Sequence, residues 1–309
     1  MSSNLAANIP EKSKPGLIKR LVTRLIGILA VGLLIFAGVI AYDINNSDSL
    51  SMSHKDINQM LIKDTKQVNL FVKSIQKIPR EIATILGLQK LRREEIKIVL
   101  DSILLNSPEL FGTAVAFEPY AFDSKKHYSS FYHYREGDVI QFKSLDVPEY
   151  DYFNKDWYRL PKILKKPIWT EPYYDDGGGG VLMATYSVPF YFFDGIKESF
   201  NGIVTVDVSI DWLTHYFTAN TKLPDNGFVT LISEKGTIIS TPNKEWEIND
   251  TIFTLAVTLK IPELAEIGRE LQQGKSGVKL ITNTLSKKKT KIFYSTIAAN
   301  KWGILYIFP

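Results

Sequence analysis

The sequence predicts an α+β protein in which one membrane-spanning helix and one long stalk helix precede two antiparallel-sheet modules in tandem. Three observations support this fold class: an apolar run near the N-terminus, a helical repeat of apolar residues after it, and strand and turn signals in the remainder. With 309 residues, 45% of them hydrophobic, the chain can bury a core of ordinary size in one or two domains. It contains no cysteine, which excludes disulfides, thiolate metal sites and cysteine nucleophiles.

The first predicted elements are a cytoplasmic tail at residues 1–20 and a transmembrane helix at residues 21–42. The run from Leu25 to Tyr42 is uncharged, and at about 1.5 Å per residue it just spans a hydrocarbon core of about 30 Å. Basic residues precede this run and acidic residues follow it, so the positive-inside rule places the N-terminus in the cytoplasm. The body is then periplasmic or extracellular, and the protein is anchored in the inner or cytoplasmic membrane.

A cleaved signal peptide is the alternative reading of the same segment, with Val39-Ile40-Ala41 as the cleavage site. The apolar run exceeds the usual signal-peptide core of ~7–15 residues, which favours an uncleaved anchor. The body is exported in either case.

The net charge of +4 comes entirely from the tail, because five Lys and Arg residues before residue 25 stand against a single glutamate. The rest of the chain is neutral. A neutral body offers no electrostatic footprint for nucleic acid, so no nucleic-acid partner is expected.

Residues 43–106 are predicted to form the stalk and the N-terminal helices of the body. Apolar residues between Ser51 and Leu88 recur mostly at three- and four-residue steps, as on one face of a long helix, and Pro79 is a candidate kink. A second helix is predicted at Arg93–Asn106, with two glutamates in its first turn, where the helix dipole favours acidic side chains.

The pattern then changes to strands, which we assign to a membrane-distal module at residues 107–220 and a membrane-proximal module at residues 221–309. In the first we expect strands and a short final helix at Phe111–Phe117, Tyr128–Tyr134, Val139–Lys143, Met183–Phe193, Gly202–Val208 and Ile210–Thr218. In the second we expect a helix at Thr251–Leu271 and strands at Phe228–Ser233, Thr237–Ser240, Val278–Asn283, Lys289–Ile297 and Ile304–Phe308.

Residues suited to ligand binding are concentrated between Tyr150 and Asp207, where aromatic and acidic side chains are dense. Aromatic faces attract an ammonium group through the ring quadrupole. A carboxylate gives the same group a charge-assisted hydrogen bond. This combination predicts a site for a small cationic or zwitterionic ligand.

The chain from about residue 45 to residue 309 resembles the double Cache sensor domain, in which two PAS-like modules lie outside the membrane on a long helix. The stretches that carry the resemblance are WTEPYYD from Trp169, GGGG with MATYSVPFY from Gly177, and GIVTVDVS from Gly202. They are similar to sensor domains that precede bacterial PP2C-type phosphatase, histidine-kinase or chemoreceptor outputs. The resemblance implies the ligand-sensing region of a transmembrane receptor, homodimeric through its stalk helix and not itself an enzyme.

A subset of double Cache domains binds amino acids through a fixed pattern of aromatic, basic and acidic residues. The pattern falls on this chain at Tyr150, Lys155, Trp157, Tyr158, Tyr173, Asp175 and Asp207. In that family the basic residue and the tryptophan hold the ligand carboxylate, while the acids and aromatics hold the amine. The departure is Lys155, because the family has an arginine there and a lysine lacks its two-pronged geometry. The resemblance therefore leaves amino acid, amine and small organic acid open as ligands.

Each of these residues can also be interpreted as part of the fold and not of a ligand site. Trp157 and Tyr158 can pack the core between helix and sheet, and Asp175 can belong to a solvated loop. Asp207 lies in an apolar strand, and a buried carboxylate without a partner costs several kcal/mol. Its partner is then a ligand amine, a lysine or backbone donors.

The remaining motifs do not indicate a metal, a cofactor or a catalytic centre. The four histidines are scattered, and His127 and His133 are expected on the surface, too far apart to share an ion. The run Gly177–Gly180 lacks the Gly-Lys-Ser/Thr ending of a phosphate cradle and is interpreted as a flexible hairpin or pocket lid.

Two other functions remain open from the sequence. One is a free-standing, membrane-anchored binding or adhesion protein. The other is an exported hydrolase with Asp175 and Asp207 as paired carboxylates. In the double Cache family a strand like Lys301–Leu305 precedes a second membrane helix, so a receptor is expected to continue beyond Pro309 with its output domain.

Overall fold

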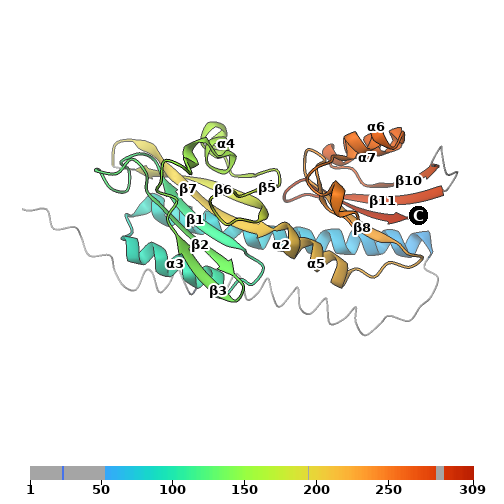
Figure 1. Ribbon diagram of the computed structural model, residues 1–309, viewed down its shortest axis with the longest axis horizontal. Helices are drawn as coiled ribbons and strands as arrows, with labels where there is room; N and C mark the ends of the chain where they lie inside the picture. Colours follow the sequence, from blue (N-terminus) through green and yellow to red (C-terminus); the bar gives the residue numbers. More distant parts are fainter. Residues whose placement is uncertain (1–22, 24–52, 194, 283–288) are drawn as a thin grey trace, which may run out of the picture.

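The computed structural model describes residues 23, 53–193, 195–282 and 289–309. It shows one long helix and two antiparallel sheets that follow one another along it, which confirms the predicted α+β class (Figure 1). The predicted tail at residues 1–20 and transmembrane helix at residues 21–42 lie outside the described residues, Thr23 excepted. Within the described ranges, no helix is both long and apolar enough to cross a membrane.

The long helix is α2, His54–Leu88, which begins at a capping box. The Ser53 hydroxyl accepts a hydrogen bond from the Asp56 amide, and the Asp56 carboxylate accepts one from the Ser53 amide. Two backbone N–H groups that would otherwise lack a partner are thus satisfied. Its 35 residues extend over about 50 Å, enough to pass behind both sheets. Pro79 lies inside the helix and is buried.

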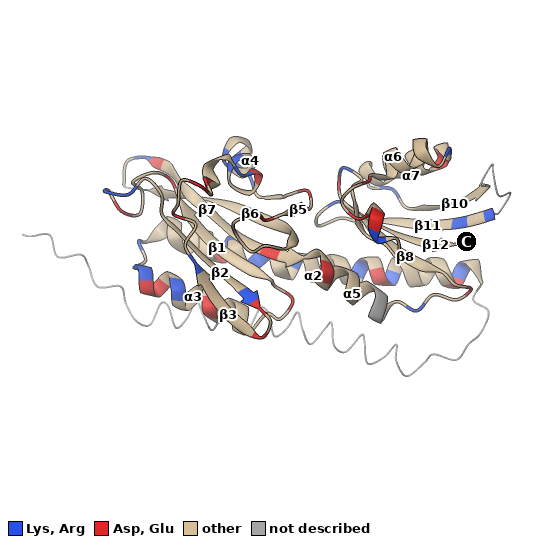
Figure 2. Cartoon of the chain, viewed as in Figure 1, with Lys and Arg blue, Asp and Glu red and all other residues tan. Residues whose placement is uncertain are grey.

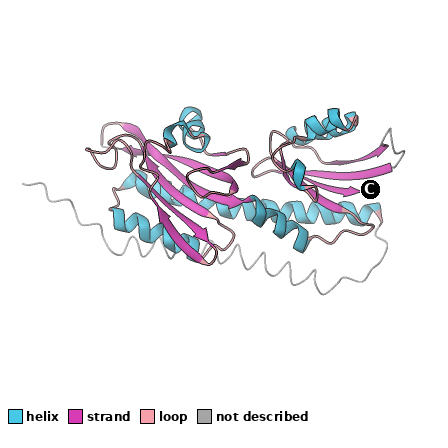
Figure 3. Ribbon diagram, viewed as in Figure 1, coloured by secondary structure: helices cyan, strands magenta, loops and turns pink. Residues whose placement is uncertain are grey.

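The first sheet has the strand order β3-β2-β1-β7-β6-β4, and β5 pairs with β6. Its strands are β1 (Gly112–Phe117), β2 (Ser130–Glu136), β3 (Val139–Lys143), β4 (Ile168–Trp169), β5 (Tyr173–Tyr174), β6 (Leu182–Phe193) and β7 (Glu198–Ser209). Helix α3 (Arg93–Leu105) lies beside α2 on one face, and the short helix α4 (Asp156–Leu164) covers the other (Figure 3). Helix α5 (Ile210–Asn220) leads to the second sheet.

The second sheet has the order β10-β11-β12-β8-β9. Its strands are β8 (Phe228–Ile232), β9 (Ile238–Ser240), β10 (Gly277–Thr282), β11 (Lys289–Ile297) and β12 (Trp302–Phe308). Two hydrogen bonds join it to α2 at the β11–β12 turn. The Ala299 amide donates to Asn69 Oδ1 at 2.8 Å, and Gln76 Nε2 donates to the Ala299 carbonyl at 2.9 Å.

Both sheets repeat one topology. In each, the last strand of the module is central and lies between the first strand and the penultimate strand: β7 between β1 and β6, and β12 between β8 and β11. The predicted boundary between residues 220 and 221 falls between the two sheets, at the end of α5.

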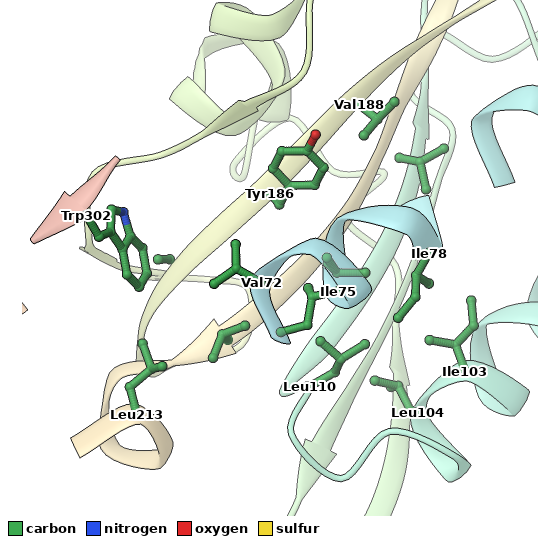
Figure 4. Close-up of a cluster of buried hydrophobic side chains, with 14 of the residues drawn as sticks. Val72, Ile75, Ile78, Ile103, Leu104, Leu110, Tyr186, Val188, Leu213 and Trp302 are labelled. Carbon is green, nitrogen blue, oxygen red and sulfur yellow. The ribbon is translucent and has the colours of Figure 1, made fainter. Parts of the chain in front are cut away.

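The main core lies where α2 packs on the sheets. Apolar side chains of α2 at helical spacing meet α3, the first sheet, α5 and the second sheet, as Val72, Ile75, Ile78, Ile103, Tyr186, Leu213 and Trp302 illustrate (Figure 4). On the solvent side, Lys and Arg alternate with Asp and Glu along α2 and α3 (Figure 2). The apolar repeat predicted this arrangement, in which one stripe of the helix is buried and the opposite stripe is solvated.

Two expectations are wrong, and three short elements of the structure were not predicted. The predicted helix at Thr251–Leu271 is wrong: it is divided into α6 (Ile252–Thr258) and α7 (Pro262–Gln272), because Lys260 adopts a φ of +56° and Pro262 opens the second helix. Helix α4 and the short strands β4 and β5 were not predicted.

His133 was expected on the surface, and that expectation is wrong. It is 2% exposed, and its Nδ1 lies 2.6 Å from Oδ1 of Asp101 on α3. Burial lowers the pKa of His133, although the Asp101 hydrogen bond opposes this. The alternation along β2 turns this side chain toward α3, a contact that β2 alone could not reveal.

Candidate ligand-binding site

A small cavity lies on the face of the first sheet that is turned away from α2, beside helix α4. Its empty space is about 210 Å³, counting the part open to solvent. The residues that line it are Ala114, Tyr132, Leu145, Tyr150, Trp157, Tyr173, Asp175, Thr205 and Asp207. Five of the seven predicted site residues are therefore brought together, from segments far apart in the sequence.

The floor of the cavity is strand β1, whose side chains on this face are small. Gly112 pairs with Asp207 of β7, and Ala114 pairs with Thr205 of β7 on one side and Tyr132 of β2 on the other. A Cβ atom on Gly112 would lie 2.7 Å from the Tyr132 hydroxyl and 2.8 Å from Asp207 Oδ2. The glycine thus leaves room for two polar groups to face each other across the strand.

Asp207 is the innermost acid and is 3% exposed. Thr185 Oγ1 of the neighbouring strand β6 donates a hydrogen bond to its Oδ1 at 2.7 Å. The Tyr173 hydroxyl lies 2.9 Å from the same Thr185 oxygen. Because the threonine has one proton and donates it to Asp207, Tyr173 is the donor in this second bond.

The pKa of Asp207 is raised to about 7. Burial is the main cause, the negative charge of Asp175 adds to it, and the hydrogen bond from Thr185 opposes it. The empty site therefore destabilises the charged form of Asp207, as expected of a carboxylate that lacks a cationic partner.

Asp175 follows β5 and is 4% exposed. Its Oδ1 accepts a hydrogen bond from the Tyr150 hydroxyl at 2.7 Å, and its Oδ2 accepts the Gly179 amide at 2.7 Å. A Cβ atom on Gly178 would lie only 2.0 Å from Oδ2, so the glycine run can close tightly around the carboxylate. Lys143 Nζ donates to the Gly178 carbonyl at 2.9 Å and ties the turn to strand β3. The solvated-loop reading of Asp175 is thereby excluded.

The cavity walls are aromatic. Tyr150 lies in the loop before α4, Trp157 in the first turn of α4, and Tyr173 in β5. Tyr132 completes the wall and was missed by the sequence reasoning, because it belongs to β2, outside the segment from Tyr150 to Asp207. The only sequence signal for it is the strand alternation that places it opposite the small side chain of Ala114.

Lys155 and Tyr158 do not reach the cavity wall. The Lys155 Nζ lies 4.7 Å from the centre of the Tyr150 ring, a cation–π contact. Tyr158 is fully buried, and its hydroxyl donates to Glu118 Oε1 at 2.6 Å, an acid that also pairs with Lys162 at 2.7 Å. These contacts agree with the interpretation of Tyr158 as a residue that packs the core between helix and sheet.

The chemistry of the cavity favours a cation. It has two buried carboxylates and aromatic walls, and the described residues that line it include no lysine, arginine or histidine. In the described part of the chain, no group of three or more His, Asp and Glu side chains could hold a metal ion. A small organic cation is the ligand type that this arrangement would stabilise.

Comparisons with known proteins give the family of the first module and the relatives of the fold. Residues 96–215 match the family model described as the methyl-accepting chemotaxis protein-like, first PDC sensor domain. No curated protein matches the sequence.

Solved structures share the fold over more than four fifths of this chain. The extracellular domain of mmHK1S-Z3, which is described as a histidine kinase, has a TM-score of 0.72 and 25% identity, over 84% of this chain and 95% of that chain. The periplasmic sensory domain of the Campylobacter jejuni chemoreceptor Tlp1 has a TM-score of 0.62 and 14% identity, over 82% and 93%. The ligand-binding domain of the Pseudomonas aeruginosa PAO1 amino acid chemoreceptor PctB, in complex with L-Gln, has a TM-score of 0.56 and 17% identity, over 81% and 88%. At identities of 14% and 17%, the last two likenesses show the fold alone.

Proposed function

Since this chain is a double Cache sensor domain of the kind found outside the membrane in histidine kinases and chemoreceptors, we propose that it is the ligand-sensing region of a bacterial transmembrane receptor. Its ligand is a small molecule with an ammonium group, an amine or an amino acid, bound in the membrane-distal module. The N-terminal segment anchors the chain in the membrane with residues 1–20 in the cytoplasm, and two copies pair through α2.

One observation supports an ammonium compound as the ligand. Asp175 and Asp207 are both buried at one cavity, and the described residues that line this cavity include no basic side chain. The charge of Asp175 raises the cost of ionising Asp207, because like charges disfavour ionisation in a desolvated site. An ammonium group between them removes that repulsion and gains charge-assisted hydrogen bonds. A small organic acid would add a third negative charge, so it fits the cavity less well than an amine.

The neighbouring structures support the same chemical class. PctB is described in complex with L-Gln and with L-Arg, and PctC of the same organism in complex with GABA. All three molecules carry an ammonium group.

The site has a direct connection to the stalk helix. Thr185, which donates to Asp207, is followed in β6 by Tyr186, whose side chain points to the opposite face. There the Tyr186 hydroxyl accepts a hydrogen bond from Arg80 of α2. Ligand binding would shift α2 only if the ligand binds two arrangements of β6 and α2 with different affinity.

The test is a thermal-shift screen of the full 309-residue chain in detergent against amino acids, amines and small organic acids, followed by calorimetry. We expect an ammonium compound to raise the melting temperature and Asp207→Ala to abolish the shift while the protein still folds. Loss of a charged partner in a desolvated site costs about 2–5 kcal/mol, which is more than tenfold in affinity. Asp175→Ala should act in the same direction.

The matched controls are Asp211→Ala and Asp176→Ala, which remove exposed acids from nearby positions and should leave affinity unchanged. The ligand can still raise the melting temperature of Asp207→Ala, with a lower melting temperature without ligand as the only change. In that case Asp207 stabilises the fold and does not bind the ligand. The proposed site would then be wrong.

A further inference from the structure

One polar group of the cavity is unsatisfied. Tyr132 is 2% exposed, and its hydroxyl is buried without a hydrogen-bond partner among the described residues. A buried hydroxyl that lacks a partner loses its hydrogen bonds to water and gains nothing in return. Such groups are uncommon in folded proteins, so the hydroxyl requires an explanation.

The surroundings of this hydroxyl are kept open by two glycines. A Cβ atom on Gly112 of β1 or on Gly179 of the glycine turn would lie 2.7 Å from the Tyr132 oxygen. Gly179 is also the residue whose amide donates to Asp175, and Gly112 pairs with Asp207. The hydroxyl therefore lies between the floor of the cavity and its closing turn, in reach of the region where both acids converge.

The ring that carries the hydroxyl is firmly held. It stacks on Tyr134, two residues along the same strand, with ring centres 5.4 Å apart and 13° between the planes. It also packs on Ala114, its partner in β1. Because the ring has little freedom to turn away, the oxygen is preorganised at its position before any ligand enters.

We infer that the Tyr132 hydroxyl is a third oxygen contact for the ligand, together with Asp175 and Asp207, and that it makes the site specific for a primary ammonium group. The inference rests on the proposed function and adds to it both a residue and a selectivity. Because the hydroxyl has no partner among the described residues, its oxygen lone pairs are available to a ligand N–H. Three oxygens match the three N–H groups of a primary ammonium.

The size of the cavity supports the same selectivity. The cavity has room for about one water molecule, and an ammonium head group is of similar size. A trimethylammonium group is much larger and has no N–H to donate. It would meet the aromatic walls but leave Tyr132 and both acids without hydrogen-bond donors, so the site should reject it.

The test uses the full 309-residue chain and its Tyr132→Phe variant, with Tyr134→Phe as the matched control from the same strand and face. Calorimetry compares L-glutamine, γ-aminobutyrate and butylamine with the N,N,N-trimethyl derivative of each. We expect the wild-type protein to prefer the primary ammonium in every pair that binds. Tyr132→Phe should lose about tenfold in affinity for the primary ammonium and little for the trimethyl form, since only the former donates to the hydroxyl.

A second readout excludes a structural role. If the hydroxyl has no partner in the empty protein, Tyr132→Phe should leave the ligand-free melting temperature unchanged or raise it. A lower melting temperature with unchanged selectivity would mean that an ordered water pairs with the hydroxyl, and the inference would be overturned. Unchanged affinity for the primary ammonium would overturn it as well. Failure of the proposed function looks different, because then none of the six probes binds the wild-type protein.

Discussion

The two modules share a strand order and a supporting helix, yet they use the face turned away from α2 in opposite ways. In the first module this face holds Thr205 and Asp207 on the central strand β7, above the small side chains of β1. In the second module the central strand β12 presents Leu305 there. That face is filled by apolar side chains of α6 and α7: Ile252, Leu255, Ile267 and Leu271. One topology thus supports a polar cavity in one module and a dry core in the other.

Even glycine serves opposite purposes in the two sheets. The missing side chain of Gly112 leaves space for the polar atoms of Tyr132 and Asp207. The missing side chain of Gly303 in β12 is replaced by Leu271 and Ile232, which lie 2.8 and 2.9 Å from where a Cβ would be. The strand order therefore does not make the site. The side chains that the strands and the covering segments present on this face do.

The largest effect on stability should come from breaking the apolar face of the second module. Leu305 is 2% exposed, and Leu305→Ala should lower the free energy of unfolding by about 2–5 kcal/mol, because it removes buried methyl groups and leaves a cavity. Ligand affinity, measured by calorimetry below the unfolding transition, should not change. Val278→Ala, at a 54% exposed position of the same module, is the control and should cost little. A loss of affinity in Leu305→Ala would show that the second module contributes to the site.

The second prediction concerns pH and follows from Asp207, whose raised pKa is about 7. An ammonium ligand needs the ionised carboxylate, so affinity should fall by up to about tenfold for each pH unit below 7. The groups that face Asp207 are Asp175, Tyr132, Tyr150 and Tyr173, and the three tyrosines have pKa values above their usual range because of burial. They therefore stay neutral throughout this pH interval. Calorimetry between pH 8 and pH 5.5 measures the effect, and affinity independent of pH would contradict it.

The raised pKa of Asp207 also predicts how the stability of the ligand-free protein depends on pH, and this trend is opposite to that of the affinity. The pKa of Asp207 in the folded state lies above its value of about 3.9 in the unfolded chain, so folding takes up a proton between these two pH values. Stability without ligand should therefore decrease as the pH rises from about 4 to about 7. Asp207→Asn should remove this part of the pH dependence, which thermal melts across the range can measure.

The third prediction concerns the contact between the modules. Glu171, in the segment between β4 and β5, accepts hydrogen bonds from Ser233 at 2.6 Å and Thr237 at 2.8 Å at the β8–β9 turn. At the end of β4, Trp169 packs on Trp302 with ring centres 5.4 Å apart. Since Glu171 is only two residues before Tyr173 of β5, a ligand that holds Tyr173 should reduce hydrogen exchange in the β8–β9 hairpin.

Glu171→Ala should remove that ligand-dependent protection and cost about 1.5–3 kcal/mol, the usual value of hydrogen bonds to a charged acceptor. Glu171→Gln keeps an acceptor oxygen and should retain part of both effects. If hydrogen exchange in residues 228–240 responds to ligand equally in Glu171→Ala, the modules communicate by another route.

Most of the fold could be predicted from local patterns. The long helix, the strands of both sheets and the break between modules follow from apolar periodicity and turn residues. Helix α4 was missed because its nine residues are too short for a clear repeat and include Pro161. The division of α6 from α7 was missed because the apolar repeat continues through Lys260, although Pro262, which opens α7, marks the break in the sequence.

The candidate site was predictable only in part, and for a different reason. Asp207, Asp175 and Tyr173 stand in a motif that can be recognised along the chain. Tyr132 enters the cavity through the pairing of β2 with β1 and of β1 with β7, and this register is set by tertiary structure. Tyr158 fits the motif as well, but its hydroxyl is bonded to Glu118.

Lys155, where the motif departs from its family pattern, gives the last and smallest predicted effect. Its Nζ lies on the face of Tyr150, 4.7 Å from the ring centre, so it must give up a cation–π contact of about 0.5–1 kcal/mol to reach a ligand carboxylate. A half-exposed ion pair contributes about 0.2–1 kcal/mol, which leaves a net gain of at most about 0.5 kcal/mol. Lys155→Ala should therefore weaken L-glutamine binding by no more than about twofold and leave butylamine binding unchanged.

Lys155→Arg should preserve or improve L-glutamine binding, because the guanidinium can pair with a carboxylate through two parallel hydrogen bonds. Lys166→Ala, at an exposed position just after α4, controls for the loss of one positive charge near the site. Calorimetry with L-glutamine and butylamine on the three variants separates the two ends of the ligand. An equal loss for both ligands in Lys155→Ala would mean that the lysine positions Tyr150, and through it Asp175, rather than binding a carboxylate.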